Sequence, residues 1–135
     1  MIKFLGITAF KIFVTVLFLS SFSINGLSQN NKREIKEGLE LCYRFKWYEA
    51  EELFAAMVKE NPLKPDGYHY LSGIYLWYYL GSREKNDFND FVSYSDQVLE
   101  TAKNALEEDP HSAYLNYLLG SNYMYRSVAF TREEN

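Results

Sequence analysis

Two prolines mark the same local pattern at two places in the chain. Glu60-Asn61-Pro62 and Glu108-Asp109-Pro110 each close a stretch that has apolar residues at helical spacing. Nine residues after each proline comes a leucine, then a small residue at the tenth position and a tyrosine at the thirteenth. These are Leu71, Ser72 and Tyr75 after Pro62, and Leu119, Gly120 and Tyr123 after Pro110. Such an internal repeat constrains the fold more than composition does, because each unit buries its apolar face against the next. Arrays of this kind form binding surfaces more often than active sites.

The apolar residues of residues 29–135 recur at the helical period, and no segment alternates as a strand would. The expected fold class is therefore all-α, built from antiparallel helix hairpins. Helices are expected over residues 33–45 and 48–60, from Gly67 to a polar loop at Gly81–Asn86, over residues 88–108, and after Ser112. Asp66, Asp87 and Ser112 are the residue types that cap helix N-termini.

The repeat resembles the tetratricopeptide repeat family, in which each unit of about 34 residues is a pair of antiparallel helices. The prolines stand 110 − 62 = 48 residues apart, so the second unit carries an insertion of roughly 14 residues relative to that length. Glu37, Val98 and Asn116 depart from the family's pattern. The resemblance implies a TPR-like α-solenoid of about two and a half repeats: residues 29–62, residues 63–110 with the insertion, and an incomplete third unit over residues 111–135.

The resemblance also assigns packing roles. Small residues in the repeat let two helix axes approach to the usual 8–10 Å. Larger apolar residues fill the gaps, and proline ends a helix. The residues expected in these roles are Gly38, Ala50, Phe54, Pro62, Ser72, Ala102, Pro110 and Gly120.

The last expected helix has no following helix to complete its hairpin. Terminal repeats need a polar outer face, whereas residues after Ser112 are apolar on more than one side. The chain is therefore expected to be the front fragment of a longer array. The alternatives are that this helix caps the array itself, or that it docks on a second copy.

The N-terminus has the three parts of a secretory signal peptide. Lys3 and Lys11 precede the apolar run Ile12–Leu19, and small residues precede a cleavage site between Ser28 and Gln29. The run is too short to span a membrane, which takes about 20 residues as a helix. Residues 1–28 are thus expected to be removed, with the protein exported to the periplasm or cell envelope. An uncleaved N-terminal membrane anchor is the alternative.

The charge balance and the cysteine content argue against a nucleic-acid partner and against a disulfide within the chain. Residues 29–135 hold 12 basic and 18 acidic residues, a balance of 12 − 18 = −6, which argues against nucleic acid because phosphate binding needs clustered Lys and Arg. Cys42 is the single cysteine, so no disulfide within the chain is expected, and its spacing suggests a small core residue.

The sequence offers no set of catalytic or metal-binding residues. His69 and His111 lie 111 − 69 = 42 residues apart without cysteine or paired carboxylates at ligand spacing. No phosphate-binding glycine loop or nucleophile elbow occurs. We expect a protein that is not an enzyme and that takes no cofactor or metal.

Aromatic side chains are the candidate recognition groups. In the tetratricopeptide family the first helix of each repeat faces a concave groove, which would place Tyr43, His69, Trp77, Tyr117 and Tyr125 there. Tyrosine and tryptophan dominate interface hot spots, although rings at helical spacing are also ordinary core residues.

Three functions compete. The favoured one is a non-catalytic scaffold that binds a peptide or partner protein in the groove, with self-association through the last helix as a further interaction. The first alternative is a glycan or small-ligand binding module that uses exposed Tyr and Trp. The second is the N-terminal repeat region of a longer enzyme or envelope protein.

Overall fold

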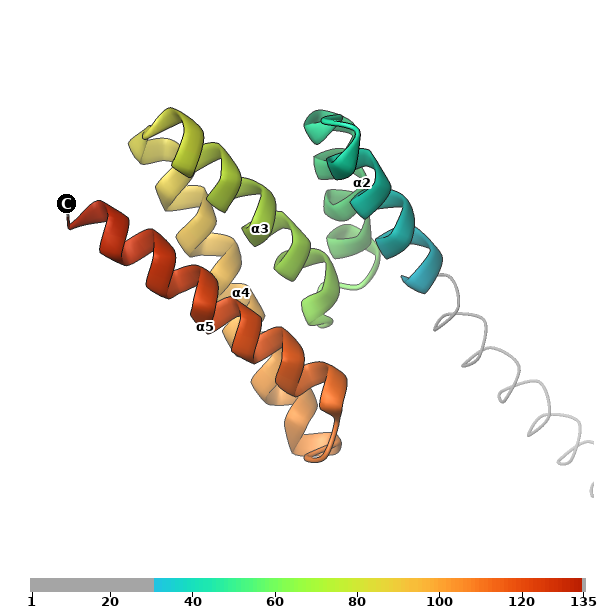
Figure 1. Ribbon diagram of the computed structural model, residues 1–135. Helices are drawn as coiled ribbons and strands as arrows, with labels where there is room; N and C mark the ends of the chain where they lie inside the picture. The colour runs from blue at the N-terminus through green and yellow to red at the C-terminus, as the bar shows by residue number, and fades with distance from the viewer. Residues whose placement is uncertain (1–30, 135) are drawn as a thin grey trace, which may run out of the picture. The chain divides into compact units, whose positions relative to one another are not determined.

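The computed structural model describes residues 31–134. The chain divides into two units between Lys36 and Glu37. In the first unit the described residues, 31–36, are helical. The second unit holds a further helical stretch, residues 37–43, and the four helices labelled in Figure 1. The expected signal peptide, residues 1–28, lies outside the described residues.

The four labelled helices are α2 (Trp47–Glu60), α3 (Pro65–Ser82), α4 (Lys85–Glu108) and α5 (Ala113–Glu133). Residues 31–134 contain no strand. The expected all-α class is therefore confirmed. Within residues 31–134, no helix is both long enough and apolar enough to cross a membrane.

Two of the three expected N-caps differ from the structure. α3 begins at Pro65, because proline has the φ of a first helical residue and lacks only an N–H that would go unpaired there. α4 begins at Lys85, where only Arg83 and Glu84 separate it from α3. Asp66 and Asp87 consequently lie inside first turns, where acids favour the helix dipole, and neither is the cap. The third expectation holds: Ser112 caps α5 by accepting from the Leu115 amide at 3.3 Å.

The expected polar loop at Gly81–Asn86 is helical except at Arg83 and Glu84. The polar stretch Gly81–Asn86 is not a six-residue loop, since α3 runs through Ser82 and α4 resumes at Lys85. Arg83 makes the turn with a φ of 63°, and its amide donates to the Tyr79 carbonyl at 2.9 Å. Helices α3 and α4 are 18 and 24 residues long.

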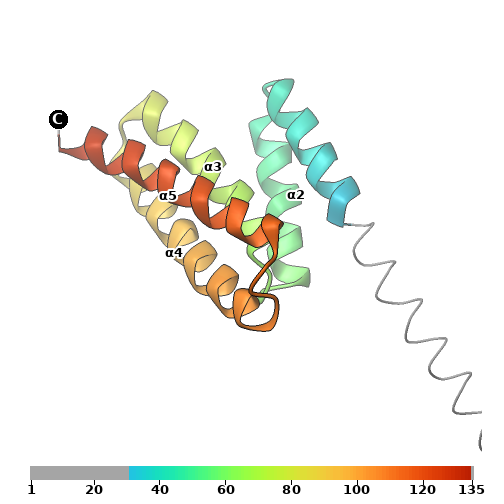
Figure 2. The ribbon, with the colours of Figure 1, turned by 60° about the horizontal axis from the view of Figure 1, so that its bottom comes forward.

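Helix α3 is central, since it packs against α2, α4 and α5 (Figures 1 and 2). Its middle is apolar around most of its circumference, as a helix between neighbours requires. A core cluster joins it to α4 and α5; the members are Leu76, Tyr79, Phe88, Phe91 and Ala129.

The approach of residues 37–43 to α2 depends on glycine. A Cβ added to Gly38 would stand 2.2 Å from Cζ of Phe54, whose side chain is fully buried. Gly67 has the same role in α3, because a Cβ there would lie 2.7 Å from Cγ2 of Val58. A larger residue at Gly38 requires the Phe54 ring or a helix to move, and one at Gly67 would also lie 2.9 Å from the Val58 backbone nitrogen.

The remaining residues expected to pack fall into three groups. Ala50, Ser72 and Ala102 are fully buried. Pro62 and Pro110 are exposed just past the ends of α2 and α4, where they end helices without filling the core. The expectation for Gly120 is wrong in the described structure, because Gly120 is exposed and a Cβ there would meet nothing within 4 Å.

Phe45 was expected to end the first helix, which instead ends at Tyr43. It occupies the turn before α2 with a φ of 58° and is 81% exposed. Its amide donates to the Cys42 carbonyl, and the Lys46 amide donates to the Leu41 carbonyl at 2.9 Å. This bond pattern ends a helix with one left-handed residue, a position that glycine usually occupies.

Polar contacts connect the helices outside the core. Glu51 of α2 accepts hydrogen bonds from the hydroxyls of Tyr75, at 2.6 Å, and Tyr78, at 3.3 Å, both on α3. Burial and this carboxylate raise the pKa of Tyr78 to about 12. Arg126 of α5 donates to the Ser95 hydroxyl and the Asp96 carboxylate of α4 at 2.8 and 2.6 Å.

Candidate functional site

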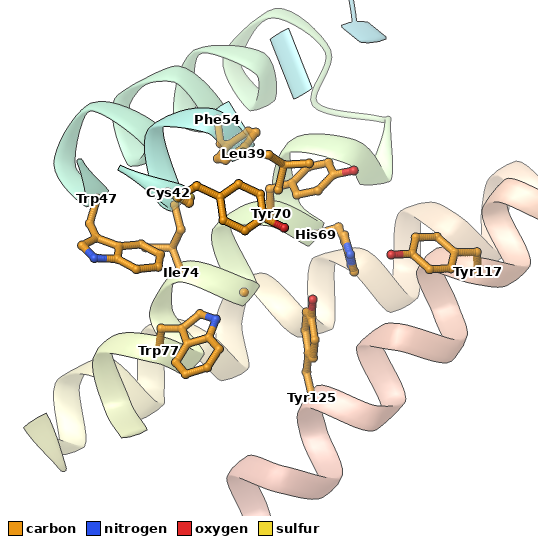
Figure 3. Close-up of a pocket in the computed structure, with 12 residues that line it drawn as sticks. Leu39, Cys42, Trp47, Phe54, His69, Tyr70, Ile74, Trp77, Tyr117 and Tyr125 are labelled. Atoms are coloured by element: carbon orange, nitrogen blue, oxygen red, sulfur yellow. The ribbon is translucent and has the colours of Figure 1, made fainter. Parts of the chain in front are cut away.

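A pocket of about 460 Å³ opens among residues 37–43, α2, α3 and α5 (Figure 3). We call it the aromatic pocket, because seven of its twelve lining residues are Phe, Tyr or Trp. Its size is within the range of small-ligand sites, roughly 300–1,000 Å³. The lining residues are Leu39, Cys42, Tyr43, Trp47, Phe54, His69, Tyr70, Gly73, Ile74, Trp77, Tyr117 and Tyr125.

The structure brings all five expected groove residues together around this pocket. They come from three segments: Tyr43 from residues 37–43, His69 and Trp77 from α3, and Tyr117 and Tyr125 from α5. Their burial differs. Tyr43, Trp77 and Tyr117 are largely exposed, Tyr125 is half-buried, and His69 is only 2% exposed.

His69 lies among three tyrosine rings. Its imidazole stacks on Tyr125, with centroids 5.5 Å apart and planes 13° from parallel, and it meets Tyr70 and Tyr117 edge-on at 5.2 and 6.3 Å. Gly73 lies next to the stacked ring, and a Cβ there would make only an ordinary contact of 3.6 Å with Cε2 of Tyr125. In Figure 3, His69, Tyr117 and Tyr125 lie together on one side of the pocket, opposite Trp47.

The His69 ring is neutral at pH 7. Burial lowers the pKa of His69 to about 4, and the nearby Asp66 carboxylate offsets only part of this effect. Nε2 lies 3.5 Å from the Ser121 hydroxyl of α5. Nδ1 is buried and has no hydrogen-bond partner among the described residues.

The other lining residues were not expected in the groove. Phe54 was expected only as a packing residue and Cys42 only as a core residue, yet both also line the pocket. Phe54 stacks on Tyr70 at 4.9 Å, which continues the aromatic wall from α2 to α3. Trp47 is the first residue of α2, and no signal in the sequence marked it.

The lining contains no Asp, Glu, Lys or Arg. Burial raises the pKa of the Cys42 thiol, which therefore stays protonated at pH 7. Among residues 31–134 no group of three His, Cys, Asp or Glu side chains is placed to hold a metal ion. The pocket therefore presents aromatic faces, hydroxyl groups and one imidazole, a set suited to a neutral ligand with apolar faces.

Comparison of the chain with protein-family models, curated proteins and solved structures finds no match.

Proposed function

We propose that this chain is a non-catalytic, TPR-like helical repeat scaffold of the bacterial cell envelope, which holds a peptide or partner protein in the aromatic pocket. The observation that carries the proposal is the convergence of Tyr43, Trp77 and Tyr117 on one pocket, although they are far apart in sequence. Exposed Tyr and Trp side chains that share a concave site provide large contact area with few rotatable bonds.

The repeat architecture is supported by the contact between Gly38 and Phe54. Gly38 lies against the Phe54 ring of the following helix. The repeat pattern assigns these packing roles to a small residue in one helix and a large residue in the next. Export is supported by the basic and apolar N-terminal pattern from Lys3 to Leu19.

Peptide display against the full-length protein tests the function. Peptides selected on the wild type are measured against Trp77→Ala and Tyr117→Ala, with Tyr123→Ala as the matched control. Tyr123 is 51% exposed, close to the 60% of Tyr117, but it does not line the pocket. Loss of a hot-spot ring weakens binding by roughly tenfold or more. Equal binding to all three variants, or no selectable peptide, would reject the scaffold.

A neutral glycan is the second candidate ligand. Trp77 and Tyr117 expose their rings at the pocket, and the lining is uncharged, which suits stacking on a sugar face. Binding of neutral oligosaccharides that is lost in Trp77→Ala, without any peptide binding, would favour this function over the scaffold.

Self-association through α5 is a further proposal. It is supported by the exposed side chains of Tyr123, Met124 and Val128. Light scattering that gives a dimer mass for the wild type and a monomer mass for Met124→Lys would support it. A monomer at every concentration would reject it.

A further inference from the structure

The unpartnered nitrogen of His69 needs a physical account. Buried polar atoms in folded proteins are almost always hydrogen-bonded, so an orphan at a pocket is a candidate ligand contact. His69 is 2% exposed, lines the aromatic pocket, and leaves Nδ1 without a partner among the described residues.

The neighbouring serine determines which kind of partner Nδ1 lacks. The Ser121 hydroxyl donates within its own helix, to the carbonyls of Tyr117 at 2.9 Å and Leu118 at 3.1 Å. Carbonyls only accept, so we assign the single hydroxyl hydrogen to them and the Nε2–H tautomer to His69, whose Nε2 lies 3.5 Å from the hydroxyl oxygen. In the neutral ring the second nitrogen, Nδ1, then carries a lone pair that can accept a hydrogen bond from a donor.

We propose that the aromatic pocket receives the ring of a partner's tryptophan or tyrosine side chain, and that the indole N–H or phenol O–H donates a hydrogen bond to Nδ1 of His69. This inference rests on the proposed function and adds the chemistry of the group that enters. An aromatic side chain has the apolar body that the lining rings would contact and the one donor that the histidine lacks.

The surroundings of His69 favour this ligand in two ways. The lining holds no Lys or Arg, so an anionic side chain would lose its hydration without gaining a charged partner. Tyr117 lies with its ring 6.3 Å from the imidazole and is 60% exposed, so an entering ring can contact it beside His69.

Paired small-molecule probes test the donor directly. Full-length protein with ¹⁵N-labelled histidine is titrated with p-cresol and with 4-methylanisole, which have similar rings but differ in the hydroxyl hydrogen. The chain has two histidines, so the imidazole signals are few. We expect p-cresol to bind about tenfold more tightly and to shift the Nδ1 resonance of His69, which 4-methylanisole leaves in place. The pair 3-methylindole and 1,3-dimethylindole should behave in the same way.

A variant separates the hydrogen bond from ring packing. His69→Phe keeps a flat ring and removes the acceptor, so p-cresol and 4-methylanisole should then bind alike. If that variant fails to fold, the wild-type resonance shift still decides. Equal affinity for both members of each pair, with an unmoved Nδ1 signal, would overturn the proposal. An Nδ1 signal of a protonated nitrogen in the free protein would overturn it as well.

The result is distinguishable from failure of the scaffold. Peptides that bind without Trp or Tyr, together with no preference for p-cresol, reject this inference and leave the proposed function standing. Donor-dependent binding of p-cresol without any selectable peptide rejects the scaffold and retains the pocket chemistry. Tighter binding of methyl β-glucoside than of p-cresol, with the Nδ1 shift, would overturn the aromatic side chain in favour of a sugar hydroxyl.

Discussion

Helices α3 and α5 carry the same marks at the same distances from Pro62 and Pro110, yet their environments differ. Ser72 of α3 is fully buried, whereas its counterpart Gly120 on α5 is exposed. Tyr75 of α3 bonds to Glu51 and stacks on Tyr94 of α4 at 5.3 Å, whereas its counterpart Tyr123 is 51% exposed. Helix α3 contacts three labelled helices and α5 contacts two. A residue that recurs in the repeat therefore has a similar place on its helix in each unit, and the neighbouring helices decide whether that place is buried.

The outward face of α5 resembles a packing face in its chemistry. Two of its three charged residues pair with another helix, Arg126 with Asp96 and Glu133 with Lys85, and the third, Arg132, is exposed in the last turn. The exposed residues at helical spacing on the far side carry no charge; they are Ala113, Asn116, Gly120, Tyr123, Met124 and Ser127. Substitutions at buried positions and on the outward face of α5 test this difference in burial.

The largest effect is expected from Phe54→Ala. Phe54 is fully buried over Gly38 and stacks on Tyr70, so its removal leaves a cavity that α2 cannot close without losing its contact with α3. Loss of a buried phenylalanine costs about 3–5 kcal/mol of unfolding free energy. Urea unfolding measures it, with Tyr123→Ala on α5 as the control at about 0.5 kcal/mol or less. Similar losses for the two variants would contradict the contrast between the helices.

The second effect depends on pH and concerns His69, whose counterpart on α5 is the exposed Tyr117. The folded-state pKa of about 4 lies below the value of 6.5 for an unperturbed histidine. Between pH 6.5 and 4 the unfolded chain therefore binds a proton that the folded chain does not, so stability falls as the pH falls. The shift corresponds to about 3 kcal/mol, at 1.36 kcal/mol per pKa unit.

His69→Gln isolates this contribution from that of the carboxylates, which titrate in both proteins. The difference in unfolding free energy between wild type and variant should shrink by that amount from pH 7 to pH 4. The groups around the ring are Asp66 and Tyr70 of α3 with Tyr117, Ser121 and Tyr125 of α5. A pH-independent difference would mean that the ring is charged or hydrated in the folded protein.

Local signals in the sequence predicted more than long-range ones. Ser112 was predicted as a cap because its hydroxyl acts within one turn, and the helical period predicted the all-α class. The start of α3 was misplaced because Asp66 is a good cap, while Pro65 is a good first residue and lies one position earlier. The left-handed turn at Phe45 has no signal, since glycine is the usual residue there.

The candidate site divides in the same way. Tyr43, His69, Trp77, Tyr117 and Tyr125 were placed together through the resemblance to a repeat family, which supplies the arrangement of helices. The contributions of Trp47 and Tyr70 depend on how α2 crosses α3, and no local pattern encodes a crossing angle. Ser121 of α5 lies next to Nε2 of His69 and leaves Nδ1 without a partner, an arrangement that is visible only in the structure.

The third effect concerns Gly38, a buried glycine that packs against Phe54 of α2. Gly38→Ala adds a Cβ 2.2 Å from Cζ of Phe54, so the ring or the helix must move. Overpacking of this kind costs about 1–3 kcal/mol, which exceeds the gain in helix propensity. Urea unfolding should show a lower midpoint with an unchanged slope. A more stable Gly38→Ala would show that Phe54 is free to move and that this contact does not fix the position of α2.

The smallest effect has the opposite sign and comes from Gly120→Ala. Gly120 lies in the middle of α5, is exposed, and has no atom within 4 Å of the position that a Cβ would take. Alanine restricts the unfolded backbone and favours the helix, so the variant should gain about 0.5–1 kcal/mol. Urea unfolding at a protein concentration where light scattering gives a monomer mass is the required measurement. A loss of stability instead would show that another helix covers Gly120 in solution, and that α5 is packed on its outward face as α3 is.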